Sequence, residues 1–530
     1  MVMEAGDPLL SAMPPLDDQE LYRALIARDA RFDGVFYVGV TSTRVYCRPV
    51  CRANKPRPER CRYFNSAAAA ERRGFRPCLR CRPELAPGIA PATAGDHAVA
   101  SIDAVGRLAR AAALRIAAGA LDQGGVGELA TELGVSARHL RRAVERELGA
   151  TPVQLATTRR LLTAKQLLSE TDLAITRIAF ASGFRSLRRF NSLFRTQYRL
   201  APSSLRRRGG PLRGDTAPRT ILGAIPDTIS LSLAYRPPFD WTAMRTYLLA
   251  RATPGLEAVT DEGGDRYWRS VQIQGHRGFF AVGPAPGLRT DTLRLHVSIA
   301  LLPVLIPLLA RLRHLFDLDA DPRAVASHLG RDPVLGRLIK RRPGLRVAGA
   351  IDGFDLALRA VLGQQVTVRG ASTLAGRLVR LVGEPLNDVP LPAGGRPAPI
   401  THLPVTAERL ADTSESAIAG IGLPRTRAEC VARLARAAAE GEFPELAGDA
   451  RSGDPTSFIG RLTALPGIGT WTATYIAMRA LHWPDAFPES DLGLRKAMGG
   501  LSAARLRAAA EVWRPWRAYA AQHLWASLGD

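Results

Sequence analysis

Five of the six cysteines in this chain cluster near its N-terminus. Four of them form two close pairs, Cys47 and Cys51 in "YCRPVC" and Cys78 and Cys81 in "RPCLRC". Two such pairs, brought together by folding, supply four thiolates, which Zn²⁺ binds tetrahedrally at about 2.3 Å. In a reducing cytoplasm this clustering favours a metal over disulfides, although a disulfide or a chance grouping stays open. The fifth, Cys61, has no partner at ligand spacing and is expected to be a packed free thiol.

A second group of residues suited to chemistry lies near the C-terminus, in "LTALPGIGTWTATYIAMRALHWPDAFPESDLGLRKA" (462–497). Its Gly-Ile-Gly turn, with Gly467 and Gly469, separates two apolar helical stretches. The first backbone N–H groups of the second helix have no partner within that helix, so they form an anion site. If the anion is a DNA phosphate, Asp491 lies at a fixed offset from the gripped strand and supplies half of an active site.

The elements that must position the cysteines are short. Residues 1–85 combine the strand-like "GVFYVGVTSTRVYC" with turns, in a segment too small to be held together well by its own core. A structural zinc explains how such a segment folds. Residues 86–100 are rich in Pro, Ala and Gly and are expected to be a linker.

The next segment, residues 101–208, is predicted to be helical throughout, with an apolar period of 3.6. It contains two successive helix-turn-helix patterns, with Gly134 and Gly183 in the turns and Ser136 and Ser186 as N-caps. Each second helix presents a basic and polar face, as a recognition helix in a major groove requires. These residues are Arg138, His139, Arg141 and Arg142 in the first unit and Arg185, Arg188, Arg189 and Asn191 in the second. For any one stretch, solvated arginines on a helical bundle are the alternative.

The remaining chain predicts an α+β segment with a dominant helical part. After a second linker, residues 209–225, strand-like patterns fill most of residues 226–310, and residues 311–530 are expected to be a helical core. The apolar run at 297–310 is too short for a membrane span and is predicted to be a buried helix. The Pro- and Gly-rich stretch 391–404 is expected to be a surface loop. The fold class is therefore multidomain α+β: a small zinc-stabilised α/β domain, an all-α double helix-turn-helix domain, and an α+β subdomain on a helical core.

The composition favours a polyanionic partner. The formal net charge is +23, which suggests nucleic acid before membrane. The bland alternative is an arginine-biased composition, because the chain has only four lysines. The N-terminus carries acids and prolines where a signal peptide needs a basic region and an apolar core, so we expect a cytoplasmic protein without a membrane partner.

The cysteine segment contains "FYVGVTSTRVYCRPVCRANKPRPERCRYF" followed by "AAAAERRGFRPCLRCRPE", which closely resembles the N-terminal domain of the Ada adaptive-response proteins. The resemblance implies that Cys47 is both a zinc ligand and the irreversible acceptor of a methyl group from a DNA methylphosphotriester. Cys51, Cys78 and Cys81 would complete the site. A zinc-bound thiol stays deprotonated at neutral pH, and the thiolate is the nucleophile. A purely structural zinc is the alternative.

The helix-turn-helix doublet resembles the AraC-type regulator domain, which implies promoter DNA and RNA polymerase as partners. The chain from about 228 to 528, including "RPGLRVAGAIDGFDLALRAVLGQQVTV" and "WRPWRAYAAQHLW", resembles AlkA-type 3-methyladenine DNA glycosylases. This resemblance implies that Asp491 is the catalytic aspartate and that Gln365 stands at the position of the DNA-intercalating wedge, which in close relatives is often apolar. It also implies an aromatic base pocket and a DNA-gripping hairpin. The pocket would comprise Trp471, Tyr475, Trp525 and Tyr247, and the hairpin Gly467, Gly469 and Thr470.

The chemistry of alkylated DNA fits these residues. Alkylation at N3 or N7 makes a purine cationic and a good leaving group, and electron-rich rings attract such a cation by about 0.5–2 kcal/mol per ring. A carboxylate near the sugar can stabilise the developing oxocarbenium charge or orient water, once the base is flipped out. The alternative for each aromatic residue is ordinary core packing. Glycosylases with lyase activity carry a lysine just after the hairpin, where this chain has Thr470 and Trp471, so a monofunctional enzyme without a cofactor is expected.

The sequence therefore predicts a protein of DNA alkylation repair and adaptive-response regulation. It would excise alkylated purines hydrolytically, accept methyl groups from methylphosphotriesters, and activate transcription at specific DNA sequences. One alternative is an AraC-type regulator whose glycosylase part only holds DNA, and another is an enzyme that removes oxidised bases. Such bases are neutral, so a pocket of exposed π faces favours the cationic alkylated ones. No Pro-Cys-His-Arg motif exists and Cys430 lacks that context, so repair of O6-methylguanine is not expected.

Overall fold

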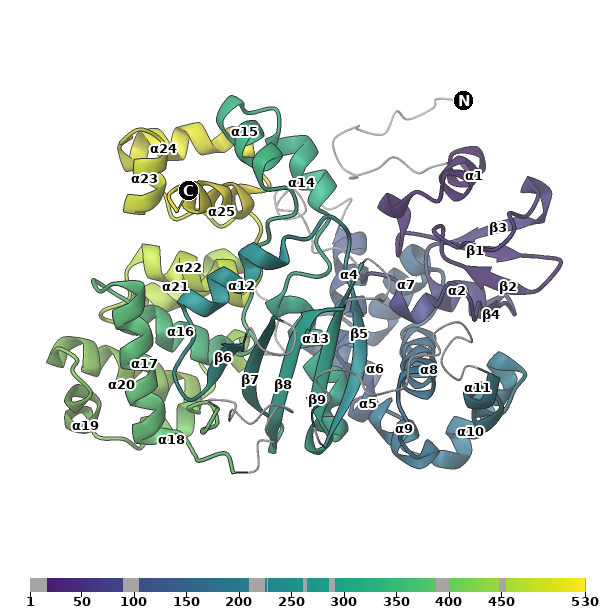
Figure 1. Cartoon of the computed structure of the whole chain (residues 1–530), viewed down its shortest axis with the longest axis horizontal. Helices are drawn as coiled ribbons and strands as arrows, with labels where there is room; N and C mark the ends of the chain where they lie inside the picture. The colour runs from purple at the N-terminus through teal and green to yellow at the C-terminus, as the bar shows by residue number, and fades with distance from the viewer. Residues whose placement is uncertain are drawn as a thin grey trace.

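The structure of this chain is a computed structural model, drawn in Figure 1. It describes residues 17–88, 104–208, 225, 227–260, 265–285, 291–387, 400–447 and 454–529. Most of the two predicted linkers, 86–100 and 209–225, and most of the predicted loop 391–404 lie outside the described residues. In Figure 1 a central sheet lies between the C-terminal helices on the left and the N-terminal half of the chain on the right. The multidomain α+β class is confirmed, and the predicted domain boundaries stay predictions.

Residues 17–88, which we call the cysteine module, are built on a four-stranded sheet in the order β3-β1-β2-β4. The strands are β1 (Tyr37–Val40), β2 (Val45–Cys47), β3 (Cys61–Phe64) and β4 (Arg76–Pro77). Strand β1 pairs antiparallel with β2 and β3, whereas β2 and β4 are parallel. The helices are α1 (Asp18–Ala27) and α2 (Ala67–Arg72), with the 3₁₀ turn η3 (Pro83–Leu85) at the end. Two small apolar clusters form its core, which agrees with a segment too small for one large core.

The helical segment contains the two predicted helix-turn-helix units. Its helices are α4 (Ala104–Ala117), α5 (Ala120–Gln123), α6 (Val126–Glu132), α7 (Ala137–Leu148), α8 (Pro152–Glu170), α9 (Ile175–Ala181), α10 (Leu187–Tyr198) and α11 (Pro202–Arg208). Both predicted N-caps are confirmed: Ser136 Oγ accepts from His139 N at 3.2 Å, and Ser186 Oγ accepts from Arg189 N at 3.3 Å. The turn glycine of the second unit, Gly183, has φ +88°, a conformation that side chains disfavour. Helix α8 connects the first unit to the second.

The central sheet is antiparallel, in the order β5-β9-β8-β7-β6. Its strands are β5 (Thr228–Ala234), β6 (Glu257–Thr260), β7 (Arg266–Ile273), β8 (His276–Pro284) and β9 (Thr292–Ser298). The apolar run at 297–310 is only partly the helix that was predicted. Val297 still pairs in the sheet with Ile229 and Phe280, and the run continues as η5 (Ile299–Val304) and α13 (Leu305–Leu315).

The rest of the chain is helical, as predicted. Helix α12 (Trp241–Ala250) lies within the sheet segment, and the others follow α13. They are α14 (Pro322–Leu329), α15 (Pro333–Arg341), α16 (Gly353–Leu362), α17 (Val368–Val382), α18 (Ala407–Ala411), α19 (Glu415–Gly420), α20 (Arg425–Ala439), α21 (Pro455–Ala464), α22 (Thr470–Ala480), α23 (Leu492–Ala497), α24 (Ala503–Ala509) and α25 (Arg517–Ser527). Two apolar clusters hold these helices together. Among the described residues, no helix combines the length and apolarity that crossing a membrane requires.

One hydrophobic core runs without a break from the second helix-turn-helix unit into the central sheet. It contains Leu167 of α8 and Phe190 and Phe194 of α10, together with Leu231 of β5 and Val297 of β9. The first unit, in contrast, has a separate small core. Because burial of apolar surface is the main stabilising contribution, the second unit and the sheet fold as one body.

Glu71 of α2 lies where the cysteine module contacts α8. Its carboxylate accepts hydrogen bonds from Tyr46 Oη at 3.0 Å and from Thr158 Oγ1 at 2.6 Å. Burial raises the pKa of this carboxyl to about 7, while the two hydrogen bonds act in the opposite direction.

This raised pKa makes a pH-dependent contribution to stability. Because the folded-state pKa of Glu71 lies above the ordinary value of 4.5, its contribution to the stability of the fold is fully present below pH 4.5. That contribution is lost as the pH rises through about 7. We expect Glu71→Gln to leave the thermal midpoint nearly unchanged at pH 5 and to raise it by a few degrees at pH 8, measured by calorimetry. The exposed Glu59→Gln should shift it at neither pH. An effect of Glu71→Gln that is equal at both pH values would contradict this.

Candidate thiolate centre, DNA-reading helices and base pocket

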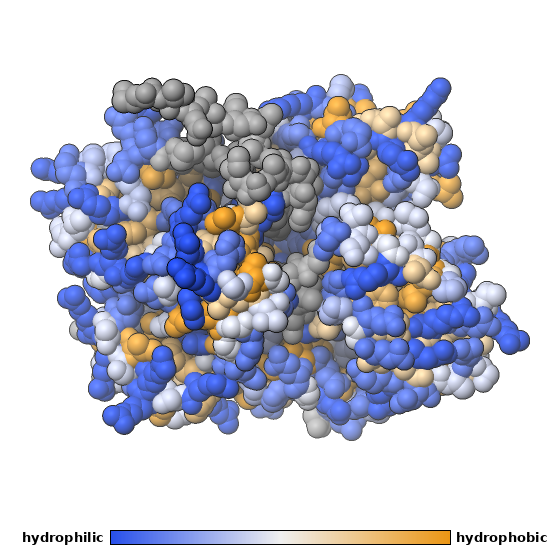
Figure 2. Space-filling model, turned by 180° about the vertical axis from the view of Figure 1, so that it is seen from behind, coloured by the Kyte–Doolittle hydropathy of each residue, from blue (hydrophilic) through white to orange (hydrophobic). Residues whose placement is uncertain are grey.

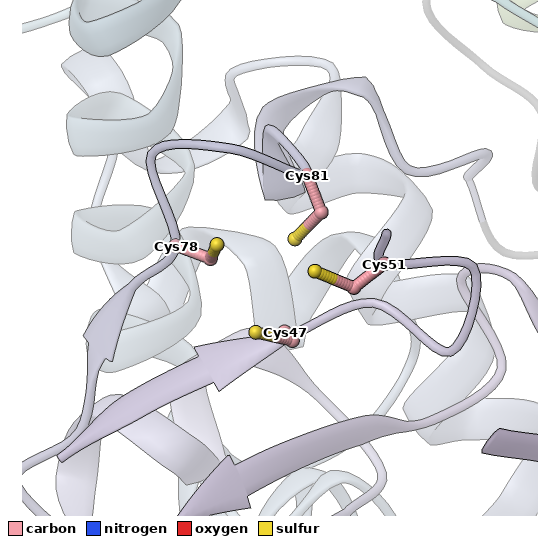
Figure 3. A group of neighbouring side chains, drawn as sticks. All are labelled: Cys47, Cys51, Cys78 and Cys81. Atoms are coloured by element: carbon pink, nitrogen blue, oxygen red, sulfur yellow. The ribbon is translucent and has the colours of Figure 1, made fainter. Parts of the chain in front are cut away.

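The four predicted metal ligands meet at one end of the cysteine module (Figure 3). Cys47 ends β2 and Cys51 follows in a turn, while Cys78 and Cys81 come directly after β4. All four Sγ atoms lie within 4.8 Å of one another. A tetrahedron with Zn–S bonds of about 2.3 Å has S–S edges of about 3.8 Å, so the four sulfurs are close to a ligand set.

Backbone N–H groups point at two of these sulfurs. Arg48 N donates to Cys81 Sγ and Arg80 N donates to Cys78 Sγ, each at 3.4 Å, as thiolates require. Hydrogen bonds between the sulfurs shift the pKa values of two of these thiols in opposite directions. The bond with Cys51 is the main cause that raises the pKa of Cys47 far above its ordinary value, and the bond with Cys47 is the main cause that lowers the pKa of Cys78. A divalent cation bound to the four sulfurs would favour the thiolate form of all four.

Cys47 differs from the other three cysteines in its exposure. It is half-buried, whereas Cys51, Cys78 and Cys81 are buried. Cys61 is also buried but lies outside the four-sulfur group, and its Sγ donates to Arg57 O at 3.5 Å.

The predicted DNA-reading side chains lie on the exposed faces of α7 and α10. Those that are exposed are Arg138, His139, Arg141 and Arg142 on α7, with Arg185, Arg188 and Arg189 at the start of α10. Asn191 is half-buried. Seen from behind, the described surface is largely hydrophilic, with apolar side chains in small groups (Figure 2).

The hairpin and the wedge loop contact each other. Gly467 has φ +98°, and a Cβ there would lie 2.8 Å from Cys430 Sγ, so the tight turn needs glycine. Gly469 is the N-cap of α22, and Thr470 begins that helix. Gln364, the neighbour of the predicted wedge Gln365, donates from Nε2 to Gly467 O at 2.9 Å.

Gln365 itself lies at an exposed bend between α16 and α17. Its φ is +54°, a left-handed conformation that is uncommon for a residue other than glycine. The side chain is exposed, and Val366 beside it is 39% exposed. The side chains of Gln365 and Val366 therefore extend from the loop that Gln364 bonds to the hairpin.

Asp491 is held by two tryptophans. Trp471 Nε1 donates to Asp491 Oδ2 and Trp525 Nε1 donates to Asp491 Oδ1, each at 2.9 Å. Leu494 N also donates to Oδ1 at 2.9 Å, because Asp491 is the N-cap of α23. Each carboxylate oxygen thus has a fixed donor, which sets the orientation of the whole group. The sequence did not reveal that the two indole N–H groups would converge on one carboxylate.

The predicted pocket aromatics lie together. The rings of Trp471 and Tyr475 are parallel within 3° at a centroid distance of 5.5 Å, and Trp525 meets Tyr475 edge-on at 6.5 Å. Tyr247 joins them through its hydroxyl, 3.0 Å from that of Tyr475. The structure therefore brings all four predicted aromatics together, and two of them, Trp471 and Trp525, bond to Asp491.

Two arginines that sequence reasoning missed lie against this group. Arg479 Nη1 donates to Tyr475 Oη at 2.8 Å, and the guanidinium of Arg251 lies 3.9 Å from the ring centroid of Tyr247. Burial raises the pKa of Tyr475, but Arg479, Arg251 and the hydrogen bonds to its hydroxyl outweigh that effect and lower the pKa to about 8. One signal was available, because Arg479 lies one helical turn after Tyr475.

Three family models match parts of the chain. They are the metal binding domain of Ada over residues 20–84, a helix-turn-helix domain over residues 129–208, and the AlkA N-terminal domain over residues 230–352. The last match extends beyond residue 310, where the sequence patterns change from strand to helix. The models cover the thiolate centre and both DNA-reading helices.

Three relatives are similar to the whole chain or to one part of it. The "Probable bifunctional transcriptional activator/DNA repair enzyme AlkA" of Mycobacterium tuberculosis is 39% identical to this chain over 97% of both chains. The "DNA-3-methyladenine glycosylase 2" of Escherichia coli is 37% identical over 56% of this chain and 97% of its own. The "Bifunctional transcriptional activator/DNA repair enzyme Ada" of Escherichia coli is 41% identical over 13% of this chain and 20% of its own.

Proposed function

Because the chain belongs to the family of bifunctional transcriptional activator/DNA repair enzymes AlkA, we propose that it excises alkylated purines, accepts methyl groups from DNA, and activates transcription. The family joins an Ada metal-binding domain, an AraC-type helix-turn-helix region and an AlkA glycosylase. The observation that carries the excision activity is the carboxylate of Asp491 fixed between two indole N–H groups.

In the proposed excision, the hairpin of Gly467 and Gly469 binds a backbone phosphate and the exposed loop at Gln365 fills the gap that the flipped base leaves. The rings of Trp471 and Trp525 attract the cationic base. Asp491 then stabilises positive charge on the sugar as the bond to the base breaks, or orients the attacking water. No cofactor takes part in this reaction.

In the proposed methyl transfer, Cys47, Cys51, Cys78 and Cys81 would hold one Zn²⁺, which would keep the thiolates deprotonated at neutral pH. The sulfur of Cys47 attacks the methyl carbon of a methylphosphotriester. An S–C bond forms, the C–O bond breaks, and the phosphate leaves as an ordinary charged diester. The thiolate is not regenerated from the thioether, so each chain reacts once.

In the proposed regulation, the exposed faces of α7 and α10 read promoter DNA, and RNA polymerase is the partner that the bound activator recruits. The exposed arginines at the start of each helix suit contacts with guanine edges and phosphates. The expected place of action is the cytoplasm, where the DNA lies.

A base-release assay tests the excision activity. The full chain is incubated with DNA that carries 3-methyladenine and, separately, with DNA that carries an oxidised base. Release of the methylated purine is expected. No release from any methylated DNA would leave only a regulator whose glycosylase part holds DNA, and preferential release of the neutral oxidised base would indicate the other alternative.

We further expect that borohydride traps no covalent complex between the enzyme and DNA during base release. The place just after the hairpin holds Thr470 and Trp471, so no lysine is available there to form a Schiff base. The measurement is gel electrophoresis of the reduced reaction, with a lysine-bearing lyase as the positive control. A stable adduct on this chain would show that it is a lyase.

A further inference from the structure

The cysteine module packs along one face of α8, the helix that joins the two helix-turn-helix units. Thr158, Leu162 and Lys165 of α8 all contact the module, and their spacing of four and three residues places them on a single helical face. Thr158 bonds to Glu71, and Leu162 packs on the module's aromatic cluster. The module therefore lies alongside the connection between the units.

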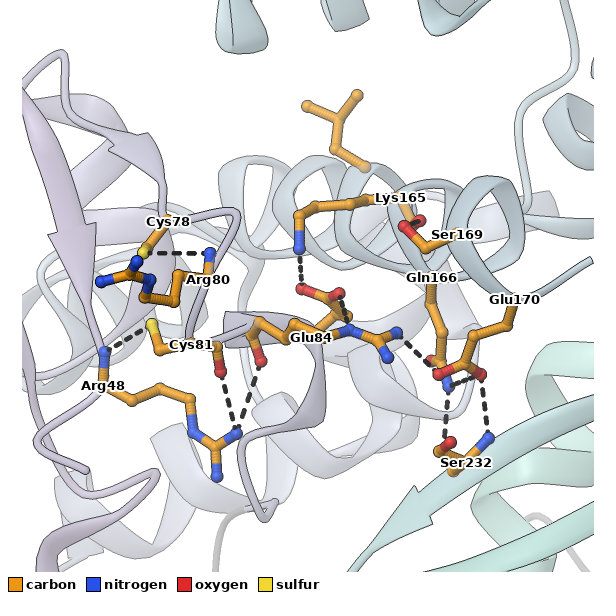
Figure 4. Close-up of polar contacts among 12 residues, drawn as sticks. Arg48, Cys78, Arg80, Cys81, Glu84, Lys165, Gln166, Ser169, Glu170 and Ser232 are labelled. Atoms are coloured by element: carbon orange, nitrogen blue, oxygen red, sulfur yellow. Dashed lines mark hydrogen bonds and ion pairs between the residues drawn. The ribbon is translucent and has the colours of Figure 1, made fainter. Parts of the chain in front are cut away.

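A buried charge network fixes the end of this contact (Figure 4). Lys165 pairs with Glu84, and their side chains are only 2% and 1% exposed. Arg82 bonds to Glu84 at 2.9 Å and to Glu170, the last residue of α8, at 2.6 Å. Glu170 also accepts from Ser232 N of the central sheet at 2.9 Å. Because each buried charge here is paired, the network fixes the module, α8 and the sheet in one relative position.

The module also holds the last turn of α7. Ser66 Oγ donates to Leu148 O at 2.7 Å, and Arg72 Nη1 pairs with Glu145 at 2.5 Å. A Cβ on Gly149, the C-cap of α7, would lie 3.0 Å from Ala69 Cβ, so the backbones are in close contact.

The same part of the module holds the last turn of α10. Gln197 Nε2 donates to Phe75 O at 2.9 Å. The stretch from Ser66 to Phe75 thus touches the C-terminal ends of both recognition helices, while their N-terminal reading faces stay exposed. This arrangement matters because the first unit has its own small core, separate from the core that anchors the second unit to the sheet.

We propose that the cysteine module is a brace that fixes the angle and distance between α7 and α10, so that the protein accepts duplex DNA with two half-sites at one defined spacing. This role is independent of methyl acceptance. It rests on the proposed DNA reading by α7 and α10. Two recognition helices held rigidly can enter successive major-groove segments at only one separation, whereas loosely joined units tolerate several.

The test is selection from a pool of random duplexes with the full, zinc-loaded chain. Wild type is expected to enrich a bipartite site of single spacing. The variant R72A/Q197A removes the contacts of Arg72 with Glu145 and Gly149 at the end of α7 and the contact of Gln197 in α10 with the module. It should enrich the same half-sites at several spacings and bind the wild-type duplex about tenfold more weakly. The control R73A/T196A changes the exposed neighbours of the two residues, and it should behave as wild type.

Two further measurements separate the brace from a folding defect. R72A/Q197A should keep its zinc content and its methyl transfer from methylphosphotriester DNA. The charge swap R72E/E145R restores the ion pair to α7, and in the Q197A background it should narrow the spacing again. If wild type and R72A/Q197A select the same single spacing with equal affinity, the brace is wrong while DNA reading stands. If wild type enriches no duplex at all, the proposed DNA reading itself fails, and the brace with it.

Discussion

Asp491→Asn is expected to lower the rate of 3-methyladenine release by at least about a hundredfold while DNA affinity stays equal or rises. The carboxylate charge stabilises the transition state, in which the sugar becomes positive, and it contributes little to the grip on the phosphates. An amide also conflicts with the site. Both carboxylate oxygens accept from indole N–H groups, and the amide nitrogen would place a donor against one of them.

The control for this substitution is Asp454→Asn. Asp454 caps α21 as Asp491 caps α23, by accepting from Ser457 N at 2.8 Å, so both variants keep a good N-cap residue and lose one negative charge at a helix start. Single-turnover base release and DNA binding are measured for both. We expect Asp454→Asn to retain release. Near-full turnover by Asp491→Asn would remove that residue from the mechanism.

Cys47→Ser is expected to abolish methyl transfer and, with it, any gain in promoter affinity after exposure to methylphosphotriester DNA. A Zn²⁺ with four thiolates has a net charge of about −2, which repels the phosphate backbone at short range. Methylation of Cys47 converts one thiolate to a neutral thioether and brings the charge to about −1. Repulsion falls, so the damage itself would strengthen DNA binding.

Radiolabelled methyl transfer and DNA affinity are measured for wild type, Cys47→Ser and the control Cys61→Ser. Cys61 is buried outside the four-sulfur group, so its variant should transfer and respond as wild type does. The affinity gain should shrink at high salt, because salt screens the charge. A methyl group recovered on Cys47→Ser would assign the acceptor elsewhere. Equal affinities of methylated and unmethylated wild type at low salt would rule out the electrostatic switch.

The sequence was sufficient where one local pattern determines the structure. Ser136 and Ser186 were predictable as N-caps, because a short polar side chain satisfies the free N–H groups at a helix start. The convergence of the four cysteines was predictable from their paired spacing. The point at which β9 ends and the helical part begins was not predictable, because an apolar run has no periodicity that distinguishes a buried strand from a buried helix.

Contacts between distant segments were beyond the sequence. Trp525 reaches Asp491 from a different helix, and Arg479 of α22 lies 5.2 Å from the ring centroid of Tyr247 in α12, far away in the chain. The helical period identifies the apolar face of α10 but does not show which other element covers it. The resemblance to known families supplied the pocket residues, whereas their hydrogen-bond partners depend on packing in three dimensions.

The unbroken core between the second helix-turn-helix unit and the central sheet has a genetic consequence. A cavity made at Phe194 or Leu231 would weaken regulator and repair enzyme together, because both draw stability from the same buried side chains. Substitutions in this shared core therefore do not separate the two traits, whereas substitutions of the exposed arginines of α7 and α10 can. Selection for stability in this shared core therefore acts on the regulator and the repair enzyme at once, even though each has its own chemistry.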